Sequence, residues 1–269
     1  MIEVLIPYRG EVNELLLSVI EKNLSNPIVD RVHLSVNPSG FGTEDFDSFR
    51  NNQKFKMTLQ SEDLGLYGNF RFLVKSAISP FLVFQCGDDV QTENYSEMVS
   101  QLKLNNKALA IPTWCWKEFN PSKSGHYGEE IHGVYPFLNS RRSRFESCEV
   151  AEPSWIFGVW RTQYLKSIFP AGNFDWLDFY ILQKSLCDNQ IVNVETESKL
   201  VIGTWKWANK VPHSVVGSGP RASEWAKRFM FLYFSYGVFW HPFISVKWLR
   251  RLIIIAVRSR ILRRESSAN

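Results

Sequence analysis

Two adjacent carboxylates, Asp88 and Asp89, follow the apolar run FLVFQ at residues 81–85 after Cys86 and Gly87. A short apolar run of this kind predicts a buried strand, and ligands of open α/β sheets bind beyond the carboxyl ends of strands. Carboxylate oxygens there suit Mg²⁺ or Mn²⁺, and such an ion can neutralise the charge of a departing diphosphate. The alternative is an acidic turn in which Asp89 caps the next helix.

A second acidic pair, Asp175 and Asp178, stands at the start of the segment DFYILQKSLC, which predicts a helix over Asp178–Cys187. Residues three apart share a helix face, so both carboxylates are expected on one side of the first turn. A carboxylate at that position has the chemistry to accept a proton from a hydroxyl group. Alternatively, the pair only stabilises the positive end of the helix dipole.

Apolar runs alternate with segments of helical periodicity, and this alternation predicts a mostly parallel sheet flanked by helices. Strands are expected at Ile2–Pro7, Val32–Val36, Phe55–Leu59, Phe81–Gln85 and Ala108–Pro112. Helices are expected at Glu11–Lys22, Gly68–Ala77, Glu93–Leu104, Gln163–Ile168 and Asp178–Cys187. The polar sequence between Thr113 and Val150 predicts long loops, and long loops in compact domains are often functional.

The composition is that of an ordinary globular chain with a basic end. Hydrophobic residues make up 45% of the 269 positions and charged residues 22%. Of the 31 Lys and Arg residues, nine lie within 225–264, which holds no Asp or Glu, leaving 22 basic against 27 acidic residues elsewhere. The widely spaced four cysteines favour reduced thiols over a disulfide scaffold. The opening MIEVLIPYRG predicts a strand rather than a signal peptide.

The basic segment 225–264 alternates aromatic or aliphatic runs with cations. Its apolar runs are too short to span a bilayer, but amphipathic, tryptophan-containing, cationic helices suit the surface of an anionic membrane. The alternative is a pair of helices packed on the domain with their arginines solvated. Nucleic-acid binding is not expected, because the rest of the chain is acidic.

Four runs, VLIPYR, VHLSVNPSG, EDLGLYGNFRF and FLVFQCGDDV, occur in an order that resembles the inverting family 2 glycosyltransferases of the GT-A fold. The resemblance covers roughly residues 1–205 and implies a Rossmann-like, mostly parallel mixed sheet. It also implies transfer of a sugar from a nucleotide diphosphate, expected to be a UDP-sugar, to a hydroxyl of a glycan or lipid-linked acceptor, with Mn²⁺ or Mg²⁺ as cofactor. This chain departs from the family pattern at Cys86, Asn37 and Asp63, which stand in place of Asp, an acidic residue and Asn.

The resemblance implies a role for each matching position on the donor side. The implied nucleotide-sugar-binding residues are Pro7, Tyr8, Arg9, Asn37, Asp63, Gly65, Arg71 and Asp88. Tyr8 would lie against the base, Asn37 and Asp63 would contact the base or ribose, and Arg71 would pair with a phosphate. Turn formation for Asn37 and Asp63 and a solvated helix position for Arg71 are the open alternatives. The expected metal ligands are Asp88, Asp89 and His213, the last in the polar loop HSVVGSGPR.

On the acceptor side, the family has its catalytic base at the start of the helix that matches Asp178–Cys187. Asp178 is therefore the preferred base, with Asp175 as the alternative. Inversion by direct displacement needs one such base and no enzyme nucleophile. Trp155 and Trp176 are expected to stack on the acceptor sugar, or else to belong to the core.

The family resemblance and the charge pattern together predict a GT-A domain at residues 1–224 and a basic amphipathic helical tail at residues 225–269. The domain would divide into a nucleotide-sugar-binding half at 1–112 and an acceptor half at 113–224. The expected location is cytoplasmic, at the inner face of the cell membrane, in cell-envelope polysaccharide synthesis. A nucleotidyltransferase is a weaker alternative, because the first strand is not followed by a glycine-rich, lysine-bearing loop. A non-catalytic carbohydrate-binding protein is a further alternative.

Overall fold

The computed structural model describes residues 1–8, 14–38, 44–85, 90–91, 94–119, 127–132, 153–170 and 177–202. The strands are β1 (Ile2–Tyr8), β2 (Val29–Val36), β3 (Phe55–Leu59), β4 (Phe81–Phe84), β5 (Val90–Gln91), β6 (Leu109–Phe119), β7 (Tyr127–His132), β8 (Val159–Arg161) and β9 (Ile191–Ile202). The α-helices are α1 (Glu14–Ser25), α2 (Asp47–Arg50), α3 (Gly65–Ser76), α4 (Tyr95–Leu104), α6 (Thr162–Ile168) and α7 (Leu177–Cys187). Two 3₁₀ turns, η1 (Glu44–Phe46) and η2 (Pro153–Phe157), complete the described elements.

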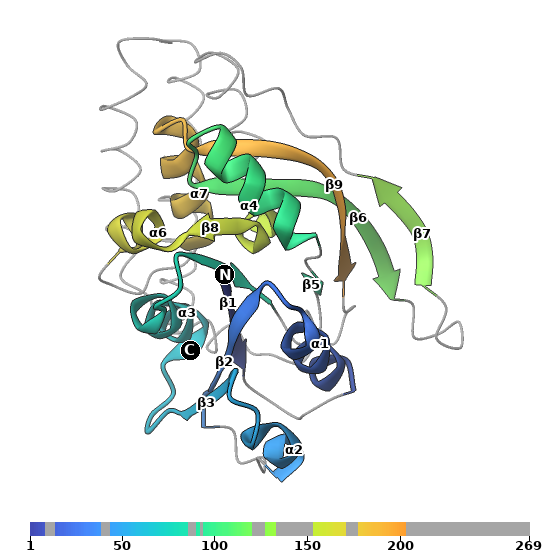
Figure 1. Cartoon of the computed structure of the whole chain (residues 1–269), viewed down its shortest axis with the longest axis vertical. Coiled ribbons are helices and arrows are strands. Elements are labelled where there is room, and N and C mark those ends of the chain that lie inside the picture. Colours follow the sequence, from blue (N-terminus) through green and yellow to red (C-terminus); the bar gives the residue numbers. More distant parts are fainter. Residues whose placement is uncertain are drawn as a thin grey trace, which may run out of the picture.

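All described strands belong to one mixed sheet of order β3-β2-β1-β4-β8-β6-β9-β5, with β7 paired to β6 (Figure 1). Strands β3, β2, β1 and β4 run parallel. Strand β8 is antiparallel to both β4 and β6, and β9 is parallel to β6. Strands β6 and β9 therefore point the same way as β1, and the expected mostly parallel mixed sheet is confirmed.

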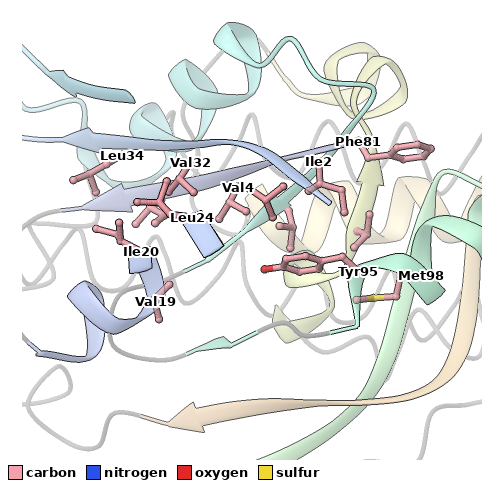
Figure 2. Packing of buried hydrophobic residues seen from close by; sticks show 14 of the residues in the cluster. Ile2, Val4, Val19, Ile20, Leu24, Val32, Leu34, Phe81, Tyr95 and Met98 are labelled. Atoms are coloured by element: carbon pink, nitrogen blue, oxygen red, sulfur yellow. The ribbon is translucent and has the colours of Figure 1, made fainter. Parts of the chain in front are cut away.

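Helices cover both faces of the sheet, and a cluster of buried side chains lies between the sheet and the helices on each face. One cluster joins α3, α6 and α7 to alternate residues of the central strands, among them Leu5, Leu82 and Leu109. The other joins α1 and α4 to the opposite face, as Figure 2 shows for Val19, Ile20 and Leu24 of α1 below Val4 and Val32 in this view. The central strands β1 and β4 are largely apolar because both of their faces are covered, as in other parallel sheets.

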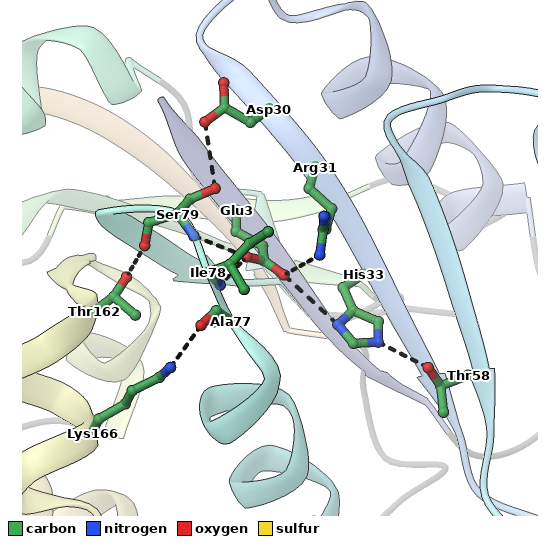
Figure 3. A network of polar contacts seen from close by, with 10 residues as sticks. All are labelled: Glu3, Asp30, Arg31, His33, Thr58, Ala77, Ile78, Ser79, Thr162 and Lys166. Carbon is green, nitrogen blue, oxygen red and sulfur yellow. Dashed lines mark hydrogen bonds and ion pairs between the residues drawn. The ribbon is translucent and has the colours of Figure 1, made fainter.

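A buried polar network ties β1 to the connection between α3 and β4 (Figure 3). The Glu3 side chain has no exposed surface, and its Oε2 accepts hydrogen bonds from the backbone N–H groups of Ile78 (2.8 Å) and Ser79 (3.3 Å). Its Oε1 lies 3.7 Å from Nδ1 of His33 and 4.0 Å from the Arg31 guanidinium. Both distances are longer than the donor–acceptor distance of a normal hydrogen bond, so the two contacts are longer-range polar contacts.

The expectation of loops from Thr113 to Val150 is wrong in part. Strand β6 continues to Phe119, well past the expected end at Pro112, and β7 covers Tyr127–His132. The long β6 and the additional strand β7 form because β6 pairs on both sides, in parallel with β9 and antiparallel with β7. No helix within the described ranges has the length and apolar character needed to cross a bilayer.

Candidate functional site

The carboxyl ends of β1 and β2 meet the start of α3, and Asn37 joins the three elements. Its backbone N–H donates to the carbonyl of Tyr8 at 3.0 Å. Its side-chain oxygen accepts from the N–H of Leu64 at 3.4 Å, and its side-chain nitrogen donates to the carbonyl of Gly65 at 3.3 Å. The side chain of Asn37 therefore fixes the turn into α3 against the ends of two strands.

Asn37 is only 1% exposed, so its amide offers no surface to a nucleotide. The expectation that it contacts a base or ribose is not supported by this placement, and the turn-forming alternative fits the contacts. The physical reason is that both polar ends of the amide already bond to the backbone. A buried amide needs such partners, because an unpaired polar group costs about 1–3 kcal/mol.

Asp63 and Gly65 form the turn that Asn37 holds. The exposed carboxylate of Asp63 accepts a hydrogen bond from the N–H of Gly65 at 2.9 Å, which is an Asx-turn. Gly65 has a φ of 65°, in the left-handed region that residues with a Cβ adopt at a cost. Gly65 therefore has a structural role in the turn, while the Asp63 carboxylate is exposed at the carboxyl edge of the sheet.

Pro7 and Tyr8 end β1 at the same edge, but little of either is open. Pro7 is buried opposite Ser35 of β2. Tyr8 is 9% exposed, and its ring meets Phe46 edge-on with centroids 6.1 Å apart. In this structure, most of the Tyr8 ring serves the packing between β1 and η1.

Helices α3 and α7 bring two polar side chains together above this edge. Helix α3 starts where β3 ends, at the carboxyl edge of the parallel strands, and α7 precedes β9, which runs in the same direction. The hydroxyl of Tyr67, in the first turn of α3, donates to Oδ1 of Asp178, in the first turn of α7, at 3.4 Å. Asp178, predicted as the base, therefore lies at the candidate site.

Arg71 follows Tyr67 by four residues, so the two side chains share one face of α3. Arg71 is partly buried, and this burial lowers the pKa of its guanidinium. An arginine keeps its charge at neutral pH despite such a shift. The face of α3 that carries Tyr67 thus also carries a fixed positive charge.

The end of β4 is held by a buried hydrogen-bonded chain. The N–H of Gln85 donates to the carbonyl of Leu5 at 3.0 Å, and its side chain donates to the Tyr95 hydroxyl at 2.9 Å. The Tyr95 hydroxyl in turn donates to Asn23 at 2.8 Å. The residue that precedes the segment of Asp88 and Asp89 is therefore anchored to β1, α4 and α1.

Six predicted site residues lie outside the described ranges, namely Arg9, Asp88, Asp89, Asp175, Trp176 and His213. Among the residues that are described, no group of three or more His, Cys, Asp or Glu side chains could hold a metal ion. The two carboxylates predicted as metal ligands follow Gln85 by three and four positions in the chain.

Trp155 belongs to the core. It is 1% exposed and packs in the cluster that joins α3, α6 and α7 to the sheet. Its ring is closed to an acceptor sugar in this structure, so the core alternative holds. The glycine that follows, Gly158, is also structural, because a Cβ there would collide with the backbone oxygen of Ala110.

Tyr67 is the residue at this site that sequence reasoning missed. It lies inside the run EDLGLYGNFRF, between the turn and Arg71, and its spacing from Arg71 was the available signal. Its partner Asp178 is 111 positions away, so no local pattern links the two.

Comparison with solved structures shows the same fold in the S. aureus protein TarS. The crystal structure of TarS 1–349 matches with a TM-score of 0.59 at 15% identity, over 86% of this chain. The same fragment in complex with UDP-GlcNAc gives a TM-score of 0.60, and in complex with UDP 0.59, each at 15% identity and over 86% of this chain. The expected GT-A fold is thereby confirmed.

The likeness extends over part of those proteins only. This chain spans 64% of the TarS 1–349 structure, 65% of the UDP-GlcNAc complex, 64% of the UDP complex and 39% of the longer TarS structure. No protein family description and no curated protein matches the sequence.

Proposed function

We propose that this chain is an inverting glycosyltransferase that moves a sugar from a UDP-sugar donor to a hydroxyl of a glycan or lipid-linked acceptor. The observation that carries the proposal is the position of Asp178. Asp178 lies in the first turn of α7 and accepts a hydrogen bond from Tyr67 in the first turn of α3, at the carboxyl edge of the sheet. Ligands of open α/β sheets bind at that edge.

The donor is proposed to bind along the ends of β1 and β2 and the start of α3. The described residues that support this are Asp63, whose carboxylate is exposed there, and Arg71, a cation suited to a phosphate. Pro7 and Tyr8 would border the proposed donor site with the small part of their surface that is exposed, since both end β1 at that edge. TarS has been solved with UDP and with UDP-GlcNAc, which supports a uridine nucleotide as donor.

Asp88 and Asp89, with His213, are proposed to hold Mn²⁺ or Mg²⁺. The donor set fits such an ion, because carboxylate oxygens are its preferred ligands and the pair lies a few residues after Gln85, which is anchored at the end of β4. When bound, the ion would neutralise negative charge on the leaving nucleotide diphosphate.

Asp178 is proposed to accept the proton of the acceptor hydroxyl as its oxygen attacks the anomeric carbon. The new bond to the acceptor oxygen forms on the face opposite the breaking bond to the diphosphate oxygen, so the anomeric configuration inverts. Asp175, the alternative base, precedes α7 by two residues.

The direct test is release of UDP from UDP-GlcNAc in the presence of Mn²⁺ and a set of glycan acceptors. We expect turnover by the wild type and its loss in Asp178→Asn, with donor binding retained. Loss in Asp175→Asn and retention in Asp178→Asn would move the base to Asp175. Full turnover in both variants would overturn the assignment of an aspartate base.

The basic tail extends the proposal to a membrane surface. Residues 225–264 are proposed to bind anionic lipid at the inner face of the cell membrane, which would bring a lipid-linked acceptor to the domain at residues 1–224.

A further inference from the structure

We propose that Tyr67 is a positioning residue for Asp178, holding the carboxylate in one orientation and favouring its ionised form. This inference rests on the proposed function, in which Asp178 is the base. It starts from the hydrogen bond that the Tyr67 hydroxyl donates to Oδ1 of Asp178 at 3.4 Å. That distance is long for a hydroxyl donor, and such bonds at catalytic sites often tighten when substrate binds.

Packing holds the elements that carry Tyr67 and Asp178 in place. The ring of Tyr67 packs against the cluster between α3, α6 and α7. Leu177, next to Asp178, is 1% exposed, and Ile181 and Leu182 in the following turn have no exposed surface. A hydroxyl on a packed ring therefore meets a carboxylate on an anchored helix turn, which is the arrangement that preorganises a reacting group.

A hydrogen bond to a carboxylate favours the charged form, and only the charged form can accept a proton. A base that is ionised and held in one rotamer is also aligned with the acceptor hydroxyl more of the time. Tyr67 would thus act through Asp178, without contacting the reacting atoms itself.

Six other charged groups lie in the described residues of the elements packed around α7. In the described residues of α3, α6, β8 and α7 with its following turn, they are Arg71, Lys75, Arg161, Lys166, Lys184 and Asp188. Lys184 and Asp188 pair with each other at 2.5 Å, Lys166 donates to the carbonyl of Ala77 at 2.7 Å, and Arg161 donates to two backbone carbonyls. Lys75 is exposed, and Arg71 lies one turn beyond Tyr67 on α3.

The chain supplies a matched control at the far end of α7. The hydroxyl of Tyr164 donates to Oδ2 of Asp188 at 3.1 Å, and this pair is also partly buried. Tyr164→Phe removes the same kind of bond from the residue that follows α7 without touching the proposed base. A purely structural role for Tyr67 predicts that the two variants behave alike.

The test compares the pH dependence of UDP release from UDP-GlcNAc, with Mn²⁺, in the wild type, Tyr67→Phe, Tyr164→Phe and Asp178→Asn. We expect Tyr67→Phe to lower kcat about tenfold, with the donor KM changed by less than about twofold. Its acidic limb should move toward higher pH by about one pH unit, because the charged carboxylate has lost a donor. Tyr164→Phe should keep the wild-type profile, and thermal unfolding should show that both variants are folded.

An unchanged profile and kcat in Tyr67→Phe, alongside an inactive Asp178→Asn, would overturn the positioning role and leave the proposed function standing. Equal losses in Tyr67→Phe and Tyr164→Phe would also overturn it, in favour of a structural bond. A wild type that releases no UDP with any acceptor would instead remove the proposed function, and the role of Tyr67 with it.

Discussion

The side-chain amide of Gln85 donates a 2.9 Å hydrogen bond to the hydroxyl of Tyr95, and these two residues flank the segment 86–94. Both are buried, at 1% and 2% exposure, and the Tyr95 hydroxyl passes the chain of bonds on to Asn23 of α1. Hydrogen bonds between side chains at the end of β4, in α4 and in α1 therefore link the two residues that flank the segment carrying Asp88 and Asp89. A site that needs fixed ligands benefits from such support.

Tyr95→Phe should lower the free energy of unfolding by about 1–3 kcal/mol, because it removes the acceptor of Gln85 and the donor to Asn23 inside the core. Denaturant titration measures this difference. Tyr164→Phe is the control, since Asp188 keeps 20% of its side chain exposed and can bond to water instead. A loss for Tyr95→Phe no greater than that of the control would contradict the role of the buried chain.

Gly65→Ala should destabilise the fold by about 1–2 kcal/mol, because the φ of 65° at this residue is unfavourable for a side chain with a Cβ. Gly65→Asn is the matched variant, since asparagine tolerates the left-handed region better than alanine. We expect the loss in unfolding free energy to be smaller for Asn than for Ala. Equal stability of wild type and Gly65→Ala would show that the turn relaxes to another conformation.

Glu3 should make the fold sensitive to acid. Burial raises the pKa of Glu3, but the contacts with His33, Ile78, Ser79 and Arg31 outweigh it and hold the pKa below its ordinary value. A lowered folded-state pKa gives stability that is present above the unfolded-state pKa of about 4.3, and that is lost as pH falls through the folded-state pKa.

Glu3→Gln should therefore cost about 1–3 kcal/mol of unfolding free energy near neutral pH. The difference from the wild type should shrink as the pH falls below about 4. Denaturant titrations across the pH range test this sign, and a difference that grows toward acid would refute it.

Deleting residues 225–269 should abolish binding to anionic vesicles, because nine of the cations lie within 225–264. Cosedimentation with phosphatidylserine vesicles, and with neutral phosphatidylcholine vesicles as control, gives the measurement. Binding of the full chain should weaken at high salt, as screened charges require. Retained binding of the truncated chain would assign the membrane contact elsewhere.

Local sequence pattern was sufficient for much of the sheet. Strand β3 occupies Phe55–Leu59 as predicted, because a short apolar run with turns on both sides leaves little freedom. Helix α3 starts at Gly65, three residues before the expected Gly68, because the Asx-turn of Asp63 and the left-handed glycine start it. Turn geometry of this kind depends on backbone angles that a hydrophobic pattern does not report.

Long-range pairing decided what local pattern missed. Strand β9 was not predicted, since its sequence IVNVETESKLVI mixes charged and apolar residues and its stability comes from pairing with β6. Trp155 was expected to stack on an acceptor sugar or else to belong to the core, and only the packing of α3, α6 and α7 around it distinguishes the two. The bond from Tyr67 to Asp178 likewise exists only because two distant helices start at one edge.

Binding of a sugar nucleotide is the central claim, and a thermal-shift series measures it most directly, because a ligand of the native state raises the melting temperature. The wild type and Asp88→Ala are melted with UDP, UDP-GlcNAc, other sugar nucleotides and ATP, each with and without Mn²⁺. We predict a rise of several degrees for the wild type with UDP-sugars, largest with Mn²⁺, and loss of the Mn²⁺ effect in Asp88→Ala. A melting temperature that no sugar nucleotide changes, with or without the metal, would contradict the account.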